Sequence, residues 1–288
     1  MKALLDVPAP AKINLFLHIT GRRADGYHLM QSVFVLLDLF DTLHFERLNT
    51  PHIGREDLAT TTPGDALPSD DLCVRAARLL QSATGCQMGA LIRLKKAIPS
   101  QAGMGGGSSD AATCLLALNR LWGTGLRRHQ LAALGLQLGA DVPFFVFGQN
   151  AWVEGIGEQL TAIDIPPQRF LVVKPLGGLA TDRIFRDPAL KRDTKPATMQ
   201  GFADNALHST QLFGVNDLQA VAEAHCPDIK ACVNWLKDQT LSARMTGSGS
   251  ALFAPLGLHV AAPSVPSEWF GHTCSSLTEH PLKNWTSD

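Results

Sequence analysis

The stretch P-S-Q-A-G-M-G-G-G-S-S-D-A-A, from Pro99 to Ala112, decides how the chain is organised. Glycines at 103, 105, 106 and 107 precede two serines, and an alanine- and leucine-rich run follows directly. Glycine permits positive φ angles and lets a ligand approach the backbone closely. A glycine run that opens a helix directs free N–H groups at one point, where the helix dipole adds positive charge. The stretch therefore predicts an anion site, which a phosphate chain fits best.

The polar residues after the glycines have distinct expected roles. Ser108 and Ser109 offer hydroxyl groups to phosphate oxygens or to a metal ion that the phosphates carry. Asp110 is expected to be a first-turn carboxylate that favours the helix start. A flexible linker is the alternative, which the apolar run after Asp110 disfavours. The motif is not the common P-loop because no lysine follows Gly107, and it does not fit the dinucleotide spacing G-x-G-x-x-G.

The composition describes a globular chain with an ample core. Of its 288 residues, 45% are hydrophobic and 18% charged, with a formal net charge of -1. These values predict neither a nucleic-acid surface nor a membrane-binding face. The start of the chain shows no signal-peptide pattern, and no apolar run reaches transmembrane length. Six cysteines without a C-x-x-C pair favour reduced thiols in the cytoplasm, and ten dispersed histidines give no zinc motif. Oligomeric state and metal ligands stay open.

Hydrophobic periodicity predicts a mixture of strands and helices. Residues 9–20 alternate and predict a half-buried strand, and residues 32–48 predict two strands with a break at 38–41. Helices are expected at 72–84, from the glycines to about 121, and at 127–138, 182–186, 217–224 and 227–238. Residues 191–205 are expected to be irregular. This order, without regular βαβ alternation, indicates an α+β fold, and the proline pair at 166–167 predicts domains 1–165 and 166–288.

Two stretches carry charged residues suited to catalysis. Lys12 and Asn14 lie one pleat apart on the polar face of the first strand, so both side chains can reach one ligand. A solvated lysine is the common alternative. Asp141, in A-D-V-P-F-F, suits a helix N-cap and equally a carboxylate that accepts a hydroxyl proton in phosphoryl transfer. A lysine beside that carboxylate would keep it ionised.

Two further stretches suit ligand binding. Tyr27, the one tyrosine of the chain, precedes His28 in D-G-Y-H, and the pair suits stacking and hydrogen bonding with a planar heterocycle. Phe185 is ambiguous, because a phenylalanine on a short helix more often belongs to the core. The stretch T-G-S-G-S, from Thr246 to Ser250, is either a tight turn or a loop that closes over the phosphates with Gly247, Ser248 and Gly249.

Taken together, these stretches resemble the GHMP kinases, the superfamily of galactokinase, homoserine kinase and mevalonate kinase. P-A-K-I-N-L-F-L, G-R-R-A-D-G-Y-H, G-M-G-G-G-S-S-D-A-A, L-G-A-D-V-P-F-F and T-G-S-G-S stand in the superfamily's order, across about residues 8–256. The D-G-Y-H and A-D-V-P elements indicate the branch that acts in the non-mevalonate isoprenoid pathway. The substrate of that branch is a methylerythritol that carries cytidine diphosphate.

The resemblance implies a two-domain fold, ribosomal-protein-like and then ferredoxin-like, with the active site between the domains. It implies transfer of the ATP γ-phosphoryl group to a tertiary alcohol, with Mg²⁺ required. Lys12 and Asp141 would form the catalytic centre and Asn14 would contact the substrate. The cytosine would lie between Tyr27 and Phe185, with His28 beside it. ATP would bind the glycine loop through Pro99, Gly103, Met104, Gly105, Gly106, Gly107, Ser108 and Ser109.

Two features depart from the superfamily pattern. Asp71 stands where asparagine commonly helps to hold the nucleotide, which leaves the adenine contacts open. The sequence after Leu256 is proline-rich where a helix usually follows. Two other functions stay in view at this point. A homoserine or mevalonate kinase would have no cytidine to explain D-G-Y-H, and a non-catalytic nucleotide sensor would not need both Lys12 and Asp141.

Overall fold

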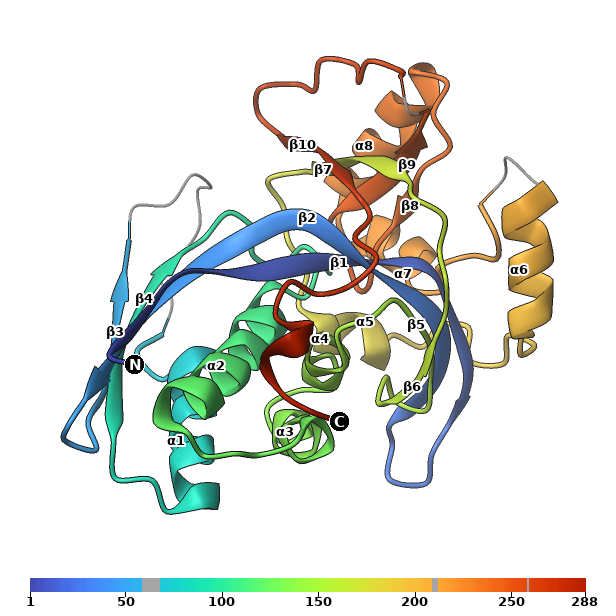
Figure 1. Cartoon of the computed structure of the whole chain (residues 1–288). Coiled ribbons are helices and arrows are strands. Elements are labelled where there is room, and N and C mark those ends of the chain that lie inside the picture. The colour runs from blue at the N-terminus through green and yellow to red at the C-terminus, as the bar shows by residue number, and fades with distance from the viewer. Residues whose placement is uncertain (59–67, 209–211, 258) are drawn as a thin grey trace.

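Two sheets and the helices around them make up the molecule in the computed structural model, which describes residues 1–58, 68–208, 212–257 and 259–288 (Figure 1). The threonine-, glycine- and proline-rich segment 51–68 is predicted to be a loop, which is wrong for residues 53–57 because they form a strand, and residues 59–67 lie outside the described range. The larger sheet has the order β3-β4-β2-β5-β6, with β1 paired to β2. Its strands are β1 (Ala3–Arg22), β2 (His28–Leu48), β3 (Ile53–Asp57), β4 (Gly89–Lys95), β5 (Ala151–Glu154) and β6 (Gln159–Ala162). The expected α+β class is confirmed.

The long hairpin of β1 and β2 runs across the whole molecule (Figure 1). Register shifts at four points mark bulges, which bend and twist the ribbon. The predicted break at 38–41 is wrong, because β2 is continuous. Asp38 accepts the N–H of Ser275, and Asp41 accepts those of Ala97 and Ile98. These aspartates bond to neighbouring segments and so do not end the strand.

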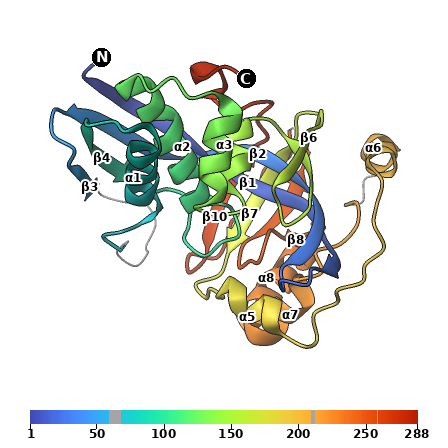
Figure 2. The same ribbon diagram turned by 90° about the horizontal axis from the view of Figure 1, so that it is seen from below.

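Helices cover one face of the larger sheet, as seen for α1, α2 and α3 in Figure 2. They are α1 (Leu72–Thr84), α2 (Gly106–Trp122), α3 (Arg128–Leu136) and α4 (Val142–Phe147). Asp71 caps α1 by accepting the N–H of Val74, and Gly85 ends the helix at φ 65°. These local signals place the helices close to their predicted ranges, and the apolar residues between helices and sheet form one core.

The second sheet covers the other face of the hairpin. Its order is β10-β7-β9-β8, formed by β7 (Arg169–Lys174), β8 (Arg244–Met245), β9 (Leu252–Leu256) and β10 (Phe270–Ser275). Phe170 and Phe253 of this sheet pack with Ile13 and Val35 of the hairpin. The half-buried strand predicted at 9–20 is therefore fully buried in its centre, polar residues included. Helices α7 (Gln219–His225) and α8 (Pro227–Asp238) pack with residues such as Leu171 and Val173 of the second sheet.

Smaller elements complete the C-terminal half. Helix α5 (Thr181–Arg186) confirms the short helix, but α6 (Met199–His208) replaces the second part of the irregular segment predicted at 191–205. The residues after 276 return to the N-terminal half. Leu277 donates its N–H to the carbonyl of Leu36. Leu282 lies just before the short 3₁₀ helix η1 (Lys283–Trp285) and Trp285 lies within it, and both pack against the core that includes α2. The domain boundary at 165/166 stays a prediction. The returning segment belongs to the second predicted domain but packs against the first.

Two chemical features of the chain bear on its environment. All six cysteines are free thiols. None of the helices in the described part of the chain combines the length and the apolar composition that a membrane span requires.

Candidate active site

A cavity of about 610 Å³ opens where the glycine loop, β1 and the turn at 246–250 meet. The structure brings most of the predicted site residues to its wall, from both halves of the chain. Those that line it are Lys12, Asn14, Pro99, Gly103, Met104, Gly105, Gly106, Gly107, Ser108, Asp141, Phe185, Gly247, Ser248 and Gly249. Ser109, Tyr27 and His28 do not. Ser109 is fully buried, and its hydroxyl has no hydrogen-bond partner among the described residues.

The glycine loop needs its glycines for two different reasons. Gly103 and Gly105 have φ angles of 70° and 72°, which side chains rarely adopt, whereas Gly106 and Gly107 already belong to the first turn of α2. A Cβ on Gly105 would lie 3.2 Å from Cγ of Lys12, so the missing side chain lets the loop touch the lysine. The first N–H groups of α2 have no acceptor within the helix and border the cavity. These N–H groups support the predicted anion site, which stays a prediction.

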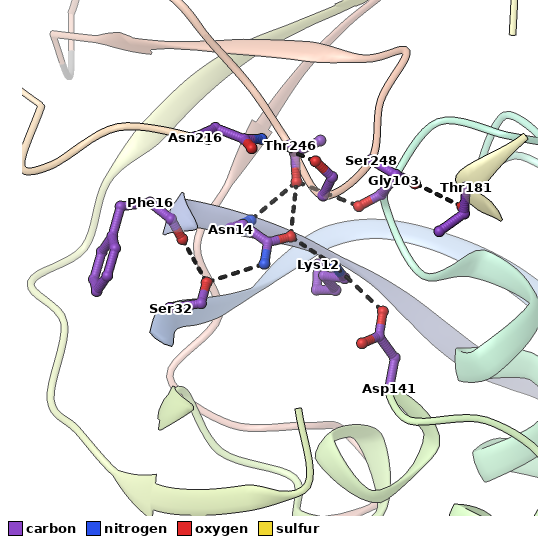
Figure 3. A network of polar contacts seen from close by, with 11 residues as sticks. Lys12, Asn14, Phe16, Ser32, Gly103, Asp141, Thr181, Asn216, Thr246 and Ser248 are labelled. Carbon is purple, nitrogen blue, oxygen red and sulfur yellow. Dashed lines mark hydrogen bonds and ion pairs between the residues drawn. The ribbon is translucent and has the colours of Figure 1, made fainter. Parts of the chain in front are cut away.

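Lys12 is buried and held from several sides (Figure 3). Its side chain is only 3% exposed, and its Nζ lies 3.3 Å from Oδ2 of Asp141. The same ammonium group donates to Oδ1 of Asn14 at 2.7 Å and stands 4.5 Å from the ring centre of Phe34. The backbone N–H of Lys12 bonds to the carbonyl of Met104 at 3.0 Å. The alternative of a solvated lysine is excluded.

Asp141 precedes α4 but does not cap it with its side chain. The carboxylate instead faces Lys12 and is 32% exposed, on the wall of the cavity. The interpretation as a side-chain N-cap is therefore wrong, because the nearby ammonium group attracts the carboxylate away from the helix end. The structure leaves Asp141 both ionically paired and accessible to a ligand.

Asn14 and Thr246 hold the lysine and join the two halves (Figure 3). The amide nitrogen of Asn14 donates to Oγ of Ser32 at 3.0 Å, and its oxygen accepts from Lys12 and, at 3.3 Å, from Thr246. The Thr246 hydroxyl also accepts the backbone N–H of Asn14 at 2.9 Å. Sequence reasoning placed Asn14 on a substrate, which stays a prediction. Its observed contacts orient the Lys12 side chain.

The turn at 246–250 lies directly against the glycine loop. Ser250 N–H donates to Gln101 at 2.9 Å and Ala251 N–H to Ala102 at 3.2 Å. Asn216, on the segment before α7, supports the turn by donating to the carbonyls of Met245 and Gly247 at 2.7 and 2.9 Å. Sequence reasoning missed Asn216 and Thr246, since nothing in V-N-D-L or in a lone threonine signals such contacts.

Lys96 forms a buried charge cluster behind the loop. Its ammonium group pairs with Asp41 and, at 2.7 Å, with Asp110. Burial raises the pKa of Asp110 to about 8 and outweighs the lowering by the Lys96 charge, while the nearby Asp41 adds a smaller rise. Asp110 is thus no first-turn carboxylate of the kind expected: it lies inside the protein, on the side of α2 that faces Lys96. The lysine was missed, although K-K immediately before the loop was a usable signal.

The predicted base-binding residues lie beside the cavity. The rings of His28 and Phe185 are 5.1 Å apart between centres, inclined by 36°. Tyr27 is 60% exposed. Arg192, which sequence reasoning also missed, donates through Nε to Nε2 of His28 at 3.0 Å. Burial lowers the pKa of His28, and the charges of Arg192 and Arg22 lower it further.

Two open points from the sequence have structural answers. Asp71 caps α1 and pairs with Arg55 at 3.0 Å, and the residue that lines the cavity here is its neighbour Leu72. No group of three or more His, Cys, Asp or Glu side chains in the described ranges is arranged to hold a metal ion.

Comparisons with known proteins agree on one family. The model of the GHMP kinases N terminal domain matches residues 71–149, and that of the GHMP kinases C terminal domain matches residues 196–269. A 4-diphosphocytidyl-2-C-methyl-D-erythritol kinase of Delftia acidovorans is 58% identical over 100% of this chain and 99% of its own. One from a Polaromonas species is 58% identical over 99% and 95%.

Solved structures give the same result. The crystal structure of a 4-(cytidine 5'-diphospho)-2C-methyl-D-erythritol kinase matches with a TM-score of 0.74 and 34% identity, over 86% of this chain and 88% of the other. A homoserine kinase from Cytophaga hutchinsonii matches with a TM-score of 0.68 at 15% identity, over 97% and 96%, and shares the fold.

Proposed function

Because the chain belongs to the 4-diphosphocytidyl-2-C-methyl-D-erythritol kinases, within the GHMP kinases, we propose that it transfers the γ-phosphoryl group of ATP to the tertiary 2-hydroxyl group of 4-diphosphocytidyl-2-C-methyl-D-erythritol. The observation that carries the assignment of roles is the Lys12–Asp141 ion pair at the mouth of the glycine loop. Phosphoryl transfer depends mainly on positioning, on charge neutralisation and on a group that accepts the hydroxyl proton.

Asp141 is the proton acceptor in this proposal. Its carboxylate is exposed to the cavity and lies 3.3 Å from the ammonium group of Lys12. As the acceptor alcohol attacks the γ-phosphorus atom, the hydroxyl proton passes to Asp141. Lys12, oriented by Asn14, stabilises the negative charge that develops between the attacking oxygen and the phosphoryl group. The bond from the γ-phosphorus to the bridging oxygen of ADP breaks in the same transfer.

The glycine loop is the proposed ATP-phosphate site. The N–H groups at the start of α2 supply donors and the positive end of the helix dipole. The Ser108 hydroxyl, on the cavity wall, fits a Mg²⁺ ion carried by the phosphates, because magnesium usually keeps phosphate and water oxygens as ligands. Bound there, the ion would neutralise phosphate charge.

The cytidine end of the substrate is proposed to lie between Phe185 and Tyr27, with His28 beside it. Phe185 lines the cavity and contacts the His28 ring, which supports a base site that continues from the phosphate site. Free thiols throughout the chain support a reducing compartment, the cytoplasm.

Release of ADP with a panel of alcohols tests the proposal. The full chain is incubated with ATP and Mg²⁺ together with the diphosphocytidyl methylerythritol, homoserine, mevalonate or galactose. We expect turnover with the first compound and none above background with the others. Turnover with homoserine or mevalonate would reassign the acceptor, and nucleotide binding without any transfer would favour a sensor.

A further inference from the structure

Arg192 connects the two residues that flank the proposed base site. Its Nε donates to Nε2 of His28 at 3.0 Å, and its Nη2 donates to the carbonyl of Phe185 at 3.1 Å. The same guanidinium donates to the carbonyls of Asp187 at 2.8 Å and Leu190 at 2.9 Å. One side chain therefore fixes both the histidine of D-G-Y-H and the end of α5 that presents the phenylalanine.

The contact with arginine determines which nitrogen of His28 carries the proton. A guanidinium group has only N–H donors and stays protonated in proteins. Nε2 of His28 must therefore be an acceptor, so the proton of the neutral ring lies on Nδ1. The lowered pKa of His28 keeps the ring neutral at pH 7. In the described part of the chain Nδ1 has no hydrogen-bond partner, which leaves one N–H donor available to a ligand.

A single fixed donor distinguishes the two pyrimidine bases. Atom N3 of cytosine is an acceptor, whereas N3 of uracil carries a hydrogen. We propose that Arg192 is a positioning residue that makes this site selective for cytosine over uracil, because it fixes the His28 tautomer whose Nδ1–H pairs with cytosine N3. The inference rests on the cytidine-containing substrate of the proposed function and deepens it.

Uracil would set its N3–H against the N–H of His28, and two facing donors leave both groups unsatisfied. We expect the full chain to bind CMP about ten- to a hundredfold more tightly than UMP, the range for one well-placed base contact. Without Arg192, neutral His28 can carry its proton on Nε2 and offer Nδ1 as an acceptor to uracil. The preference should then fall to about unity.

Calorimetric titration of CMP and UMP compares four proteins. They are the wild type, Arg192→Met, Arg192→Lys and the control Arg186→Met, whose side chain lies on α5 and is 83% exposed. Arg192→Met should lose the preference for CMP. Arg192→Lys should keep it, because lysine is also only a donor. Arg186→Met should behave as the wild type.

Nitrogen-15 NMR reads the tautomer directly, with the His28 signals identified by their absence in His28→Gln. We expect the Nδ1–H form in the wild type and in Arg192→Lys, and a shift toward the Nε2–H form in Arg192→Met. An Nε2–H tautomer in the wild type overturns the inference, even if Arg192→Met fails to fold.

The binding results separate this inference from the proposed function. A CMP preference that survives in Arg192→Met, or an equal weakening of both nucleotides there, leaves the base site in place and overturns the role of Arg192 in selectivity. A wild type that binds CMP and UMP equally overturns the selectivity inference, and one that binds neither removes the base site itself. The ADP-release assay judges phosphoryl transfer independently of both.

Discussion

Lys12 shows how a charge is kept inside this protein. Burying an ammonium group is costly unless it is paired and hydrogen-bonded. Lys12 has an anion in Asp141, an acceptor in Asn14 and the face of Phe34. Asp141 is the most exposed of these partners, with 32% of its side chain accessible beside the cavity, whereas Asn14 and Phe34 are buried. One ion pair thus compensates the buried charge of the lysine and also borders the cavity.

Replacing Asp141 by Asn should lower kcat by roughly 10²-fold or more, the usual scale for a lost proton acceptor. Stability should change little, because the carboxylate caps no helix and the amide oxygen of asparagine can still accept from Lys12. Steady-state kinetics and thermal melts of the same preparation check both statements. A melting temperature that falls in proportion to activity would mean that Asp141 is only structural.

Replacing Tyr27 by Ala should weaken CMP binding by about ten- to a hundredfold, since stacking one base on an aromatic ring contributes ~1–3 kcal/mol. The side chain is 60% exposed without ligand, so the change should cost little stability. ATP affinity, measured by calorimetry on the same variant, is the internal control and should hardly move. Equal CMP affinity in wild type and variant would instead favour an alcohol acceptor without a base.

The glycine loop and the turn at 246–250 behave as one element. Their backbones exchange hydrogen bonds at Ser250 and Ala251, and Thr246 reaches both Asn14 and the carbonyl of Gly103. The loop therefore takes its shape from the C-terminal half as well as from its own glycines. Anything that separates the two segments should disturb phosphate binding and the position of Lys12 together.

Gly103→Ala should destabilise the protein by about 2 kcal/mol or more, because a side chain at positive φ is strained. Its Cβ would also lie 2.1 Å from the carbonyl oxygen of Thr246. Gly107→Ala is the matched control, since its Cβ meets only Leu72 at 3.5 Å in ordinary contact. Its effect should stay within about 1 kcal/mol. Urea unfolding measures the free energy of unfolding of both variants. Equal losses of stability would contradict the close contact between the glycine loop and the turn.

Sequence predicted those elements whose signals are local. The start of α2 and the helix predicted at 72–84 depend on a few neighbouring residues, and the sequence indicated both. The break in β2 was wrong because Asp38 and Asp41 find their partners 237 and 56 residues away. The same limit applies to the site. Residue types indicated Lys12 and Asp141, whereas Arg192 serves through contacts that only the fold creates.

At the scale of the whole molecule, the C-terminal segment secures the helical layer. Arg128 of α3 donates to the carbonyls of Lys283 and Thr286. His280 is buried under Gly148, and its Nδ1 accepts the N–H of Leu282 at 3.0 Å. If that ring were protonated, its Nδ1–H would face the N–H of Leu282 in the interior, so two donors would oppose each other. Burial, and secondarily Arg128, lower the pKa of His280 to about 3.

This histidine predicts a loss of stability in mild acid. Below its ordinary pKa of 6.5, the unfolded chain takes up a proton at His280 that the folded chain refuses until about pH 3. The free energy of unfolding should therefore fall with pH in this window, by up to ~1.4 kcal/mol per pH unit from this group. His280→Asn, which keeps an acceptor for Leu282, should remove that part of the slope.

Urea unfolding between pH 7 and 4.5 measures how steeply the free energy of unfolding falls with pH in the wild type and in His280→Asn. The exposed His259, replaced by Asn, is the control and should leave it unchanged. If the free energy of unfolding falls equally with pH in all three proteins, the buried His280 does not contribute to the acid sensitivity.

The return of residues 277–288 to the N-terminal half has a consequence for recombination between relatives. A chimera with one crossover near the proline pair would supply its last residues from one parent and their docking surface, around Leu36 and α3, from the other. Two crossovers, the second after β10, would keep that segment with the half that it covers. Genetic exchange within this family should therefore tolerate a swapped middle portion better than a swapped end.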